Sequence, residues 1–333
     1  MEKVVIALDA MGGDYAPEQT VKGAVEAVNS SDEIRVILVG KQDMIAKELE
    51  KYEYAKEDIE VVHASEIIDM GDVPTVAIKD KKDSSLVVAM RLVREGKADA
   101  LVSAGSTGAV LVGGQLVVGR LKGIKRPPLA PFIPTTKGFS LLIDCGANVD
   151  ARPEHLVQFA LMGSIYYENV MGKKNPTVAL LNIGTEEEKG NQLVKDTKPL
   201  MKECKNINYI GSVEARELVS GAADVIVCEA FVGNVVLKFF EGLALTLFGS
   251  LKEGLMSSTR TKLGALLVKP ALKGLKNQFD TSSQGGAPLL GLKGLVVKAH
   301  GNSSSKEIEI ALKQCISFKK QKINEKIKES ICD

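Results

Sequence analysis

The chain has 333 residues, of which 45% are hydrophobic and 26% charged, as in an ordinary globular protein of one large α/β unit or two domains. Its 43 basic and 42 acidic residues leave a formal net charge of +1, and only 5% of its residues are aromatic, with no tryptophan. This balance argues against a whole-chain nucleic-acid footprint and against aromatic platforms for bases.

The five cysteines are an odd number and form no C-x-x-C pair. This spacing argues against a structural zinc site and against a disulfide framework. The chain opens with MEKVVIALD and contains no run of 18 apolar residues, so we expect no cleavable signal and no membrane-spanning segment. The sequence therefore predicts a cytoplasmic protein without a metal site.

Short β-branched runs alternate along the chain with stretches of helical period. Strands are predicted, in order, at KVVIALD, IRVILVG, IEVVHA, ADALVSA, FSLLID, TVALLN, INYIG, ADVIVCE and GLVVKAH. Helices are predicted at 17–29, 41–51, 84–96, 153–169, 189–203 and 303–327. Apolar strands that alternate with helices form a mostly parallel sheet covered on both faces. We therefore predict a three-layer αβα fold of the α/β class.

No internal repeat and no flexible linker divides the sequence. We read residues 1–333 as a single catalytic α/β unit, which could also consist of two closely packed subdomains. One compositional change occurs at about 250–280, where lysine, leucine and glycine replace the alternation of strands and helices.

Six predicted strands end in a polar residue with glycine nearby. These strand exits begin at Asp9, Ser103, Asp144, Asn182, Cys228 and His300. In an open α/β sheet the exits face one edge, where ligands bind, and glycines and helix N-termini there present backbone N–H groups. The pattern predicts an anion-binding crevice. The chain has no G-x-x-x-x-G-K-[ST] and no G-x-G-x-x-G after its first strand, which excludes a P-loop pattern and weakens a dinucleotide site.

Seven motifs then point to one family. DAMGGD, SAGSTGA, DCGAN, NIGTEEEKG, FVGNVVLK, GGAPLLGLKG and AHGNSS occur in this order over nearly the whole chain. Together they resemble the bacterial phosphate acyltransferase of phospholipid synthesis, the PlsX family. The resemblance implies a reversible conversion of acyl-[acyl carrier protein] and inorganic phosphate to acyl phosphate and free acyl carrier protein, which feeds glycerophospholipid synthesis.

The resemblance also implies a homodimer without a cofactor. Its implied fold is similar to the isocitrate/isopropylmalate dehydrogenases and to phosphotransacetylase, and its product passes to the downstream glycerol-3-phosphate acyltransferase. Three positions depart from the family pattern: Ser106 replaces the usual Asn, Glu229-Ala230 replaces Asp-Gly, and Gln284 replaces an aromatic residue. The second departure matters most if the acidic side chain touches substrate, because Glu reaches one methylene further than Asp.

Phosphate attack on a thioester needs a held phosphate, hydrogen-bond donors for the developing oxyanion, and aligned reactants. It needs no activated Ser, Cys or His, and the chain has no G-x-S-x-G elbow. Lys189 is the candidate phosphate-binding catalytic residue, and Asn148, Asn182 and Asn234 are candidate oxyanion donors. Lys189 could instead be a solvated residue at a helix start, and Asn234 could be the N-cap of a helix at 235–247.

The remaining candidate residues for binding substrate and phosphate are the glycines and polar side chains of the motifs. They are Asp9, Gly12, Gly13, Ser103, Gly105, Ser106, Thr107, Gly108, Asp144, Gly146, Gly184, Glu186, Gly233, Lys238, Gly285, Gly286 and His300. Asp9 and Asp144 could alternatively cap the helices that follow their strands. Cys145 and Cys228 lie near strand ends, where we expect small buried residues rather than nucleophiles.

The segment at about 251–277 is predicted to be a basic amphipathic helix. On a helical wheel Lys262, Lys269 and Lys273 fall in one stripe, and Leu263, Leu267 and Leu275 lie on the opposite half. Such a helix suits an anionic membrane surface or an acidic partner such as acyl carrier protein. It could instead pack at a dimer interface or on the core, and Pro270 could break it.

Two other functions stay open at this point. One is an NAD(P)-dependent dehydrogenase of the related fold, which would want an aspartate-rich metal site that does not stand out in this sequence. The other is a non-catalytic membrane-associated scaffold, which leaves the glycine-rich strand exits unexplained. The acyltransferase is the reading that the motifs favour, with the protein either free in the cytoplasm or peripheral at the inner face of the membrane.

Overall fold

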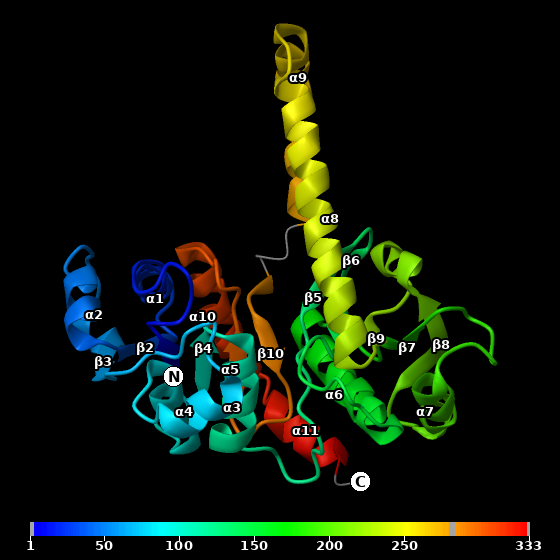
Figure 1. Ribbon diagram of the computed structural model, residues 1–333, viewed down its shortest axis with the longest axis horizontal. Coiled ribbons are helices and arrows are strands. Elements are labelled where there is room, and N and C mark those ends of the chain that lie inside the picture. The colour runs from blue at the N-terminus through cyan, green and yellow to red at the C-terminus, as the bar shows by residue number, and fades with distance from the viewer. Residues whose placement is uncertain (1–2, 280–283, 332–333) are drawn as a thin grey trace. The chain divides into compact units, whose positions relative to one another are not determined.

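The computed structural model describes residues 3–279 and 284–331, and the chain folds into two compact units, each with its own sheet. Unit 1 contains Met1–Pro131, Leu161–Asn175 and Ser282–Asp333, and unit 2 contains Phe132–Ala160 and Pro176–Thr281. Helix α6 (Pro153–Met171) contributes residues to both units. Figure 1 labels these elements, and its colours follow the chain from blue at the N-terminus to red at the C-terminus.

The sheet of unit 1 has six strands in the order β10-β11-β4-β1-β2-β3. Their bounds are β1 (Val4–Asp9), β2 (Ile34–Gly40), β3 (Ile59–His63), β4 (Ala100–Ser103), β10 (Ala287–Leu289) and β11 (Leu295–Lys298). All neighbours are parallel except β10, which runs antiparallel to β11. The central strands are buried on both faces, as in Ile6, Leu8 and Leu101, which explains their nearly continuous apolar runs.

Helices cover both faces of this sheet. One face carries α1 (Glu18–Asn29), α2 (Gln42–Leu49) and α10 (Ser305–Lys320), and the other carries α4 (Ser85–Arg94) and α5 (Thr107–Gly113) (Figure 1). Helix α3 (Pro74–Asp80) packs against α5. Shorter turns are η1 (Lys56–Asp58) and the π-helical η2 (Gly114–Val118), and α11 (Ile323–Ile331) ends the described chain. Unit 1 is therefore a three-layer αβα unit.

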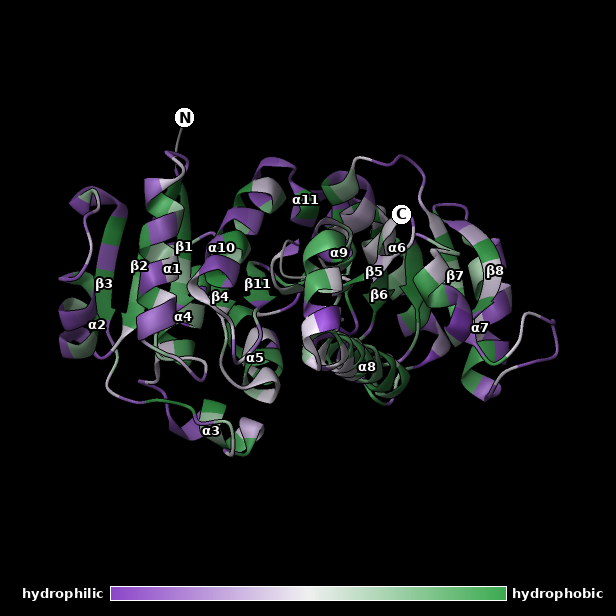
Figure 2. Cartoon of the chain, turned by 90° about the horizontal axis from the view of Figure 1, so that it is seen from above, coloured by the Kyte–Doolittle hydropathy of each residue, from purple (hydrophilic) through white to green (hydrophobic). Residues whose placement is uncertain are grey.

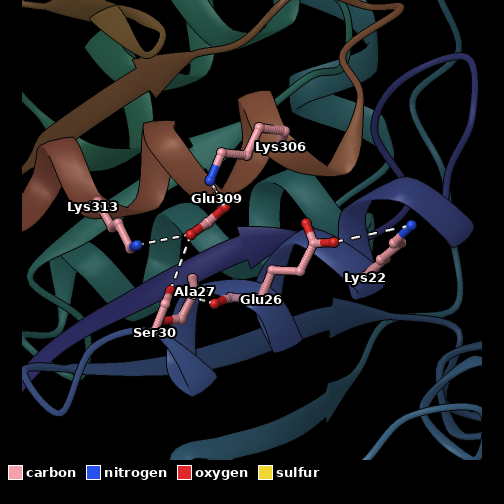
Figure 3. A network of polar contacts seen from close by, with 7 residues as sticks. All are labelled: Lys22, Glu26, Ala27, Ser30, Lys306, Glu309 and Lys313. Atoms are coloured by element: carbon pink, nitrogen blue, oxygen red, sulfur yellow. Dashed lines mark hydrogen bonds and ion pairs between the residues drawn. The ribbon is translucent and has the colours of Figure 1, made fainter. Parts of the chain in front are cut away.

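Helices α1 and α10 pack closely because Gly23 lets their backbones approach. A Cβ at Gly23 would lie 2.7 Å from the Ile308 Cβ and from the Ser305 carbonyl oxygen. Beside this contact the buried Glu309 carboxylate accepts hydrogen bonds from Lys306 (2.6 Å), Lys313 (2.7 Å) and Ser30 (3.0 Å) (Figure 3). Burial alone would raise the pKa of Glu309, but these three donors lower it to about 2.

The sheet of unit 2 has five strands in the order β5-β6-β9-β7-β8. Their bounds are β5 (Phe132–Thr135), β6 (Gly138–Ile143), β7 (Thr177–Asn182), β8 (Asn208–Glu214) and β9 (Val225–Val227). Only β5 is antiparallel to its neighbour. The unit also contains α7 (Gln192–Glu203) and the 3-10 turn η3 (Ala215–Ser220), and Leu142, Ala179 and Ile226 lie in its core.

Two long helices extend from the sheet of unit 2 as a hairpin. They are α8 (Ala230–Met256) and α9 (Thr259–Gln278), and they pack against each other (Figure 1). Of the residues of α8, only Ala230 and Gly233 are buried, although the helix is strongly hydrophobic, as its colour in Figure 2 shows. By length and composition alone α8 could cross a membrane, and 6% of its most apolar window is buried.

The predicted basic segment at 251–277 therefore covers the end of α8, the turn at 257–258 and most of α9. Pro270 does not break the helix, because α9 continues through it. The predicted α/β class, the mostly parallel pairing and the αβα layering are confirmed. The predicted sheet is in fact two sheets, one in each unit.

Candidate functional site

The six polar strand exits divide between the two units. The exits of β1, β4 and β11 lie on neighbouring parallel strands of unit 1, and those of β6, β9 and β7 lie on neighbouring parallel strands of unit 2. Each group therefore lies together at the carboxyl edge of its own sheet. The expectation that all six exits follow strands of one sheet is wrong, because strand order depends on long-range pairing that the local pattern does not contain.

In unit 1 the exits of β1 and β4 are joined by a buried hydrogen bond. The Ser103 hydroxyl donates to Asp9 Oδ2 at 2.8 Å, and Gly105 N–H donates to the Ser103 hydroxyl at 3.1 Å. Asp9 Oδ1 is buried without a hydrogen-bond partner among the described residues. Burial raises the pKa of Asp9, and the neighbouring hydroxyls of Ser85 and Ser103 only partly oppose that effect. Asp9 is not a helix cap, since α1 begins at Glu18.

The glycines of these loops allow close backbone approach. A Cβ at Gly12 would lie 2.4 Å from Asp9 Oδ2 and 2.8 Å from the Gly105 nitrogen, so no larger residue fits without movement. Asp14 N–H donates to the Gly301 carbonyl at 2.7 Å, which ties the exit of β1 to that of β11. The loops after all three strands are thus held together by their own backbone.

Lys298 at the end of β11 is a buried residue of the candidate site that our sequence analysis did not select. Its ammonium donates to the Ala299 carbonyl and, at 3.5 Å, to the Ala104 carbonyl, and only 9% of the residue is exposed. Burial lowers its pKa to about 8, although the nearby carboxylates of Asp9 and Asp14 oppose the shift. The signal in the sequence was a lysine at the carboxyl end of an apolar run predicted to be buried on both faces.

The other predicted residues of unit 1 surround this edge. Ser106 is buried at the N-cap position of α5, but its side chain makes no capping hydrogen bond. Thr107 and Gly108 lie in the first turn of α5. Gly286 N–H donates to the Gln314 side chain at 3.1 Å, and its backbone lies against the Lys298 carbonyl. The unit-1 members of the predicted set are Asp9, Gly12, Gly13, Ser103, Gly105, Ser106, Thr107, Gly108, Gly285, Gly286 and His300.

In unit 2 the loop after β6 is organised by Asp144. This fully buried carboxylate accepts hydrogen bonds from the N–H groups of Gly146 and Ala147, both at 3.1 Å, and from the Asn148 side chain at 2.7 Å. The backbone carbonyl of Asn148 in turn accepts a hydrogen bond from the Ala230 N–H at 3.1 Å. Asp144 therefore shapes its own loop rather than capping the helix that follows, and Asn148 connects that loop to α8.

The first turn of α8 lies directly against the Asp144 loop. Glu229 is the N-cap, since its carboxylate accepts the N–H groups of Phe231 (2.6 Å) and Val232 (2.8 Å). A Cβ at Gly233 would lie 1.9 Å from the Asp144 carbonyl oxygen, so only glycine allows this approach. Glu229, one of the departures from the family pattern, therefore caps α8 in this chain. Asn234 is not an N-cap, because α8 begins four residues earlier.

Asn234 and Lys238 are one helical turn apart on α8 and therefore share a face. Asn234 is half-buried and Lys238 is exposed. Neither side chain hydrogen-bonds to another of the described residues in the structure. Both are therefore available to a ligand near the Asp144 loop.

The loop after β7 carries Lys189. The Asn182 side chain donates both amide hydrogens within this loop, to the Gly184 carbonyl at 2.9 Å and to the Lys189 carbonyl at 3.2 Å. A Cβ at Gly184 would lie 2.6 Å from a Glu186 carboxylate oxygen and 3.1 Å from the Lys189 Cγ. Asn182 therefore holds the loop in this conformation. The exposed Lys189 ammonium has no partner among the described residues.

A second missed residue lies beneath the same loop. Lys198 of α7 is 4% exposed, and its ammonium donates to the carbonyls of Glu186, Glu187 and Lys189. A helical wheel could have found it, because Val194, Thr197, Lys198 and Met201 form the buried face of α7.

The cysteines near the strand ends are buried, as predicted. Burial raises the thiol pKa of Cys145 and of Cys228 well above its ordinary value. A neutral buried thiol is a poor nucleophile. Within residues 3–279 and 284–331, no group of three His, Cys, Asp or Glu side chains is placed to hold a metal ion.

Unit 1 also contains a cavity of about 230 Å³ at the opposite, amino-terminal edge of its sheet. Ala100 and Leu295 at the starts of β4 and β11 line it, together with Phe318 and Lys319 of α10. It contains none of the predicted site residues.

Residues 4–326 match the family model described as "Fatty acid synthesis protein". The chain is 55% identical over 326 residues to the phosphate acyltransferase of Alkaliphilus oremlandii (strain OhILAs), covering 98% of this chain and 97% of that protein. The chain belongs to the PlsX family of phosphate acyltransferases. It is accordingly an acyltransferase of fatty acid and phospholipid synthesis.

Solved structures agree with the fold. A phosphotransacetylase from Streptococcus pyogenes superposes with a TM-score of 0.66 at 17% identity, covering 94% of this chain and 93% of that one. A 4-hydroxythreonine-4-phosphate dehydrogenase from Burkholderia phymatum gives a TM-score of 0.50 at 13% identity, covering 95% and 98%. The predicted likeness to phosphotransacetylase and to a dehydrogenase fold is therefore confirmed at the level of the fold.

Proposed function

We propose that this acyltransferase takes its acyl group from acyl-[acyl carrier protein] and transfers it reversibly to inorganic phosphate. The observation that supports this most directly is the loop after β7, where the exposed Lys189 ammonium has no protein partner while Asn182 and Lys198 fix the backbone around it. A compact, unpaired cation on a fixed loop suits a phosphate. No cofactor enters the proposal.

In the proposed mechanism a phosphate oxygen attacks the thioester carbonyl directly. A new C–O bond forms, and the resulting oxyanion is stabilised by hydrogen-bond donors. Asn234 is the donor we favour, because Asn182 uses both amide hydrogens within its loop and Asn148 is bonded to Asp144. When the oxyanion collapses, the C–S bond breaks, and the carrier protein leaves as a thiol with the proton that the attacking hydrogen phosphate gives up. Lys189 offsets the phosphate charge throughout.

The test mixes purified protein with acyl carrier protein thioester and phosphate, and follows acyl phosphate by hydroxamate trapping. Lys189→Ala should raise the KM for phosphate by about one to two decades, since a charged hydrogen bond contributes roughly 1.5–3 kcal/mol. Lys195→Ala, at an exposed lysine of α7, is the matched control and should leave phosphate kinetics unchanged. Activity that required ATP or NAD(P), or unchanged phosphate kinetics in Lys189→Ala, would contradict the proposal.

We also propose that α9 brings the protein to the inner face of an anionic membrane or to acyl carrier protein. Leu263, Leu267 and Leu275 are 61%, 84% and 42% exposed, and Lys262, Lys269 and Lys273 on the same helix are exposed as well. Acyl phosphate is lipid-like, so its transfer to the downstream glycerol-3-phosphate acyltransferase at a bilayer would limit its loss to water. A few leucines and lysines would give reversible, salt-sensitive binding.

Leu267→Glu separates the possibilities for α9. Loss of vesicle flotation with unchanged melting supports a membrane surface, and loss of carrier affinity supports a docking surface. A large fall in melting temperature would instead make these leucines part of a packed interface.

A homodimer is the third part of the proposal. Exposed apolar residues of α8, namely Phe231, Val235, Phe239, Leu243, Leu247 and Leu251, recur at every fourth position and offer a surface for a second copy. Leu243→Glu should then yield a monomer by light scattering, and an unchanged mass would contradict this part.

A further inference from the structure

Lys198 is a buried lysine whose ammonium is fully occupied by one loop. Its Nζ donates to the carbonyl oxygens of Glu186 at 3.1 Å, Glu187 at 2.8 Å and Lys189 at 3.1 Å. An ammonium has three N–H donors, so each has an acceptor, and all three acceptors lie within four residues of sequence. The residue is 4% exposed, so this arrangement is enclosed by protein.

The orientation of these carbonyls fixes the orientation of the neighbouring N–H groups. A trans peptide is planar, so its N–H points away from its own C=O. Because three carbonyls converge on Lys198, the N–H groups of Glu187, Glu188 and Gly190 point away from it. None of these three N–H groups donates to an acceptor among the described residues. The loop that carries Lys189 thus directs three backbone donors away from the buried ammonium.

The charges of the loop explain why a cation beneath it would matter for an anionic ligand. Glu186, Glu187 and Glu188 are consecutive acids that oppose an anion. Glu187 is paired with the exposed Lys202 at 2.8 Å, and Lys198 places a further positive charge under the backbone itself. Because Lys198 is buried, its field is screened much less by solvent than that of a surface lysine.

We propose that Lys198 is a positioning residue for phosphate use: it holds the 186–190 backbone so that Lys189 and the outward N–H groups face the phosphate. This inference rests on the phosphate-binding role proposed for Lys189. Lys198 itself does not touch the substrate. A lysine that served stability alone would change the melting temperature without a selective effect on phosphate.

The experiment compares Lys198→Met, Lys198→Arg and the control Lys202→Met, which removes the exposed cation of α7 that pairs with Glu187 of the same loop. Lys198→Met should raise the KM for phosphate about tenfold, equivalent to the loss of roughly one charged hydrogen bond. The KM for the acyl thioester should change less than about twofold, as expected when only one substrate site is disturbed. Lys198→Arg should recover much of the loss because it keeps the charge and several donors, and Lys202→Met should resemble the parent protein.

A second measurement separates this proposal from the role of Lys189. Hydrogen exchange at the amides of residues 186–190 should speed up in Lys198→Met and not in Lys189→Ala. If Lys189→Ala leaves phosphate kinetics unchanged while Lys198→Met still alters exchange and phosphate KM, the role of Lys189 fails and the positioning role stands. If Lys198→Met lowers only the melting temperature, with unchanged phosphate KM, the positioning role is overturned. Should Lys198→Met not fold, Lys198→Gln is measured by the same criteria.

Discussion

Replacing Gly233 with alanine tests whether the contact between α8 and the Asp144 loop is as close as the structure shows. The added Cβ would lie 1.9 Å from the Asp144 carbonyl oxygen and 3.0 Å from the Cys228 sulfur. An ordinary carbon–oxygen contact is about 3.4 Å, so the backbone would have to separate by roughly 1.5 Å. No rotamer change can relieve a clash with a carbonyl, so either the first turn of α8 or the Asp144 loop must move.

The energy of this change has two opposing parts. Overpacking in a close-packed site costs typically about 1–3 kcal/mol, and a backbone clash lies at the upper end. Replacing glycine inside a helix gains about 1 kcal/mol. We expect Gly233→Ala to lower the free energy of unfolding by about 2 kcal/mol, and to reduce turnover because Asn234 lies on the displaced turn.

Gly242→Ala in the same helix is the matched control. A Cβ there has no atom within 4 Å, so only the propensity gain remains, and we expect stability to rise by up to about 1 kcal/mol. Denaturant unfolding of both variants, with acyl phosphate formation measured in parallel, gives the comparison. Equal stability and activity of the two variants would refute the close approach at Gly233.

Three further predictions follow from buried groups. Because the pKa of Glu309 is lowered to about 2, its carboxylate stabilises the fold at pH values above the ordinary pKa of 4.5, and this stability is lost as the pH falls toward 2. Glu309→Gln should therefore lower the free energy of unfolding by about 1–2 kcal/mol at pH 7, a figure discounted because Lys306 is exposed. The loss should become progressively smaller below pH 4.5. Lys298 loses its proton near pH 8 when folded, so between about pH 8 and 10.5 the parent should gain up to about 3 kcal/mol of unfolding free energy relative to Lys298→Met; a pH-independent difference would contradict the burial effect. Mass spectrometry after mixing with acyl thioester alone should show unmodified protein, since burial holds the thiol pKa of Cys145 and Cys228 well above its usual range; an adduct at either cysteine would overturn direct transfer to phosphate.

The strands and helices predicted from the sequence are those in which apolar residues recur with a clear local periodicity. Each of the nine predicted strands corresponds to a strand of the structure, and the parallel arrangement followed from their apolar runs. The antiparallel edge strands β5 (FIPT) and β10 (APL) were missed because each contains a proline, Pro134 and Pro288, and proline within a short run argues against a strand. The predicted helix at 303–327 is interrupted after Lys320, where Lys322 adopts a φ of +53°. Lysine has no special preference for that conformation, so nothing in the sequence marked the break.

Helix α8 was anticipated only as the alternative helix at 235–247 and the start of the segment at about 251–277, and its true beginning at Ala230 was not found. A helix that packs one face on a core alternates apolar and polar residues with a period of 3.6, whereas α8 is apolar around most of its circumference (Figure 2). Local periodicity therefore gives little indication of where such a helix begins and ends.

The motif glycines were predicted to bring backbone N–H groups close to a phosphate. In the structure, Gly12 and Gly233 instead permit close contact within the protein, with Asp9 and Asp144 respectively.

The lysines show most clearly what residue type alone leaves undetermined. Lys189 is exposed and unpaired, Lys198 is buried on three carbonyls, and Lys298 is buried beside two aspartates that lie too far for an ion pair within 4 Å. Motif reading selected Lys189 because glycine surrounds it, and it passed over the other two because apolar neighbours surround them. Burying an ammonium is costly unless its donors are satisfied, so a lysine on the apolar face of a helix or at the end of a buried strand implies a compensating arrangement of acceptors. At both positions that arrangement is backbone from a strand-exit loop, which is why the two lysines missed from the sequence lie against the loops that the sequence did predict.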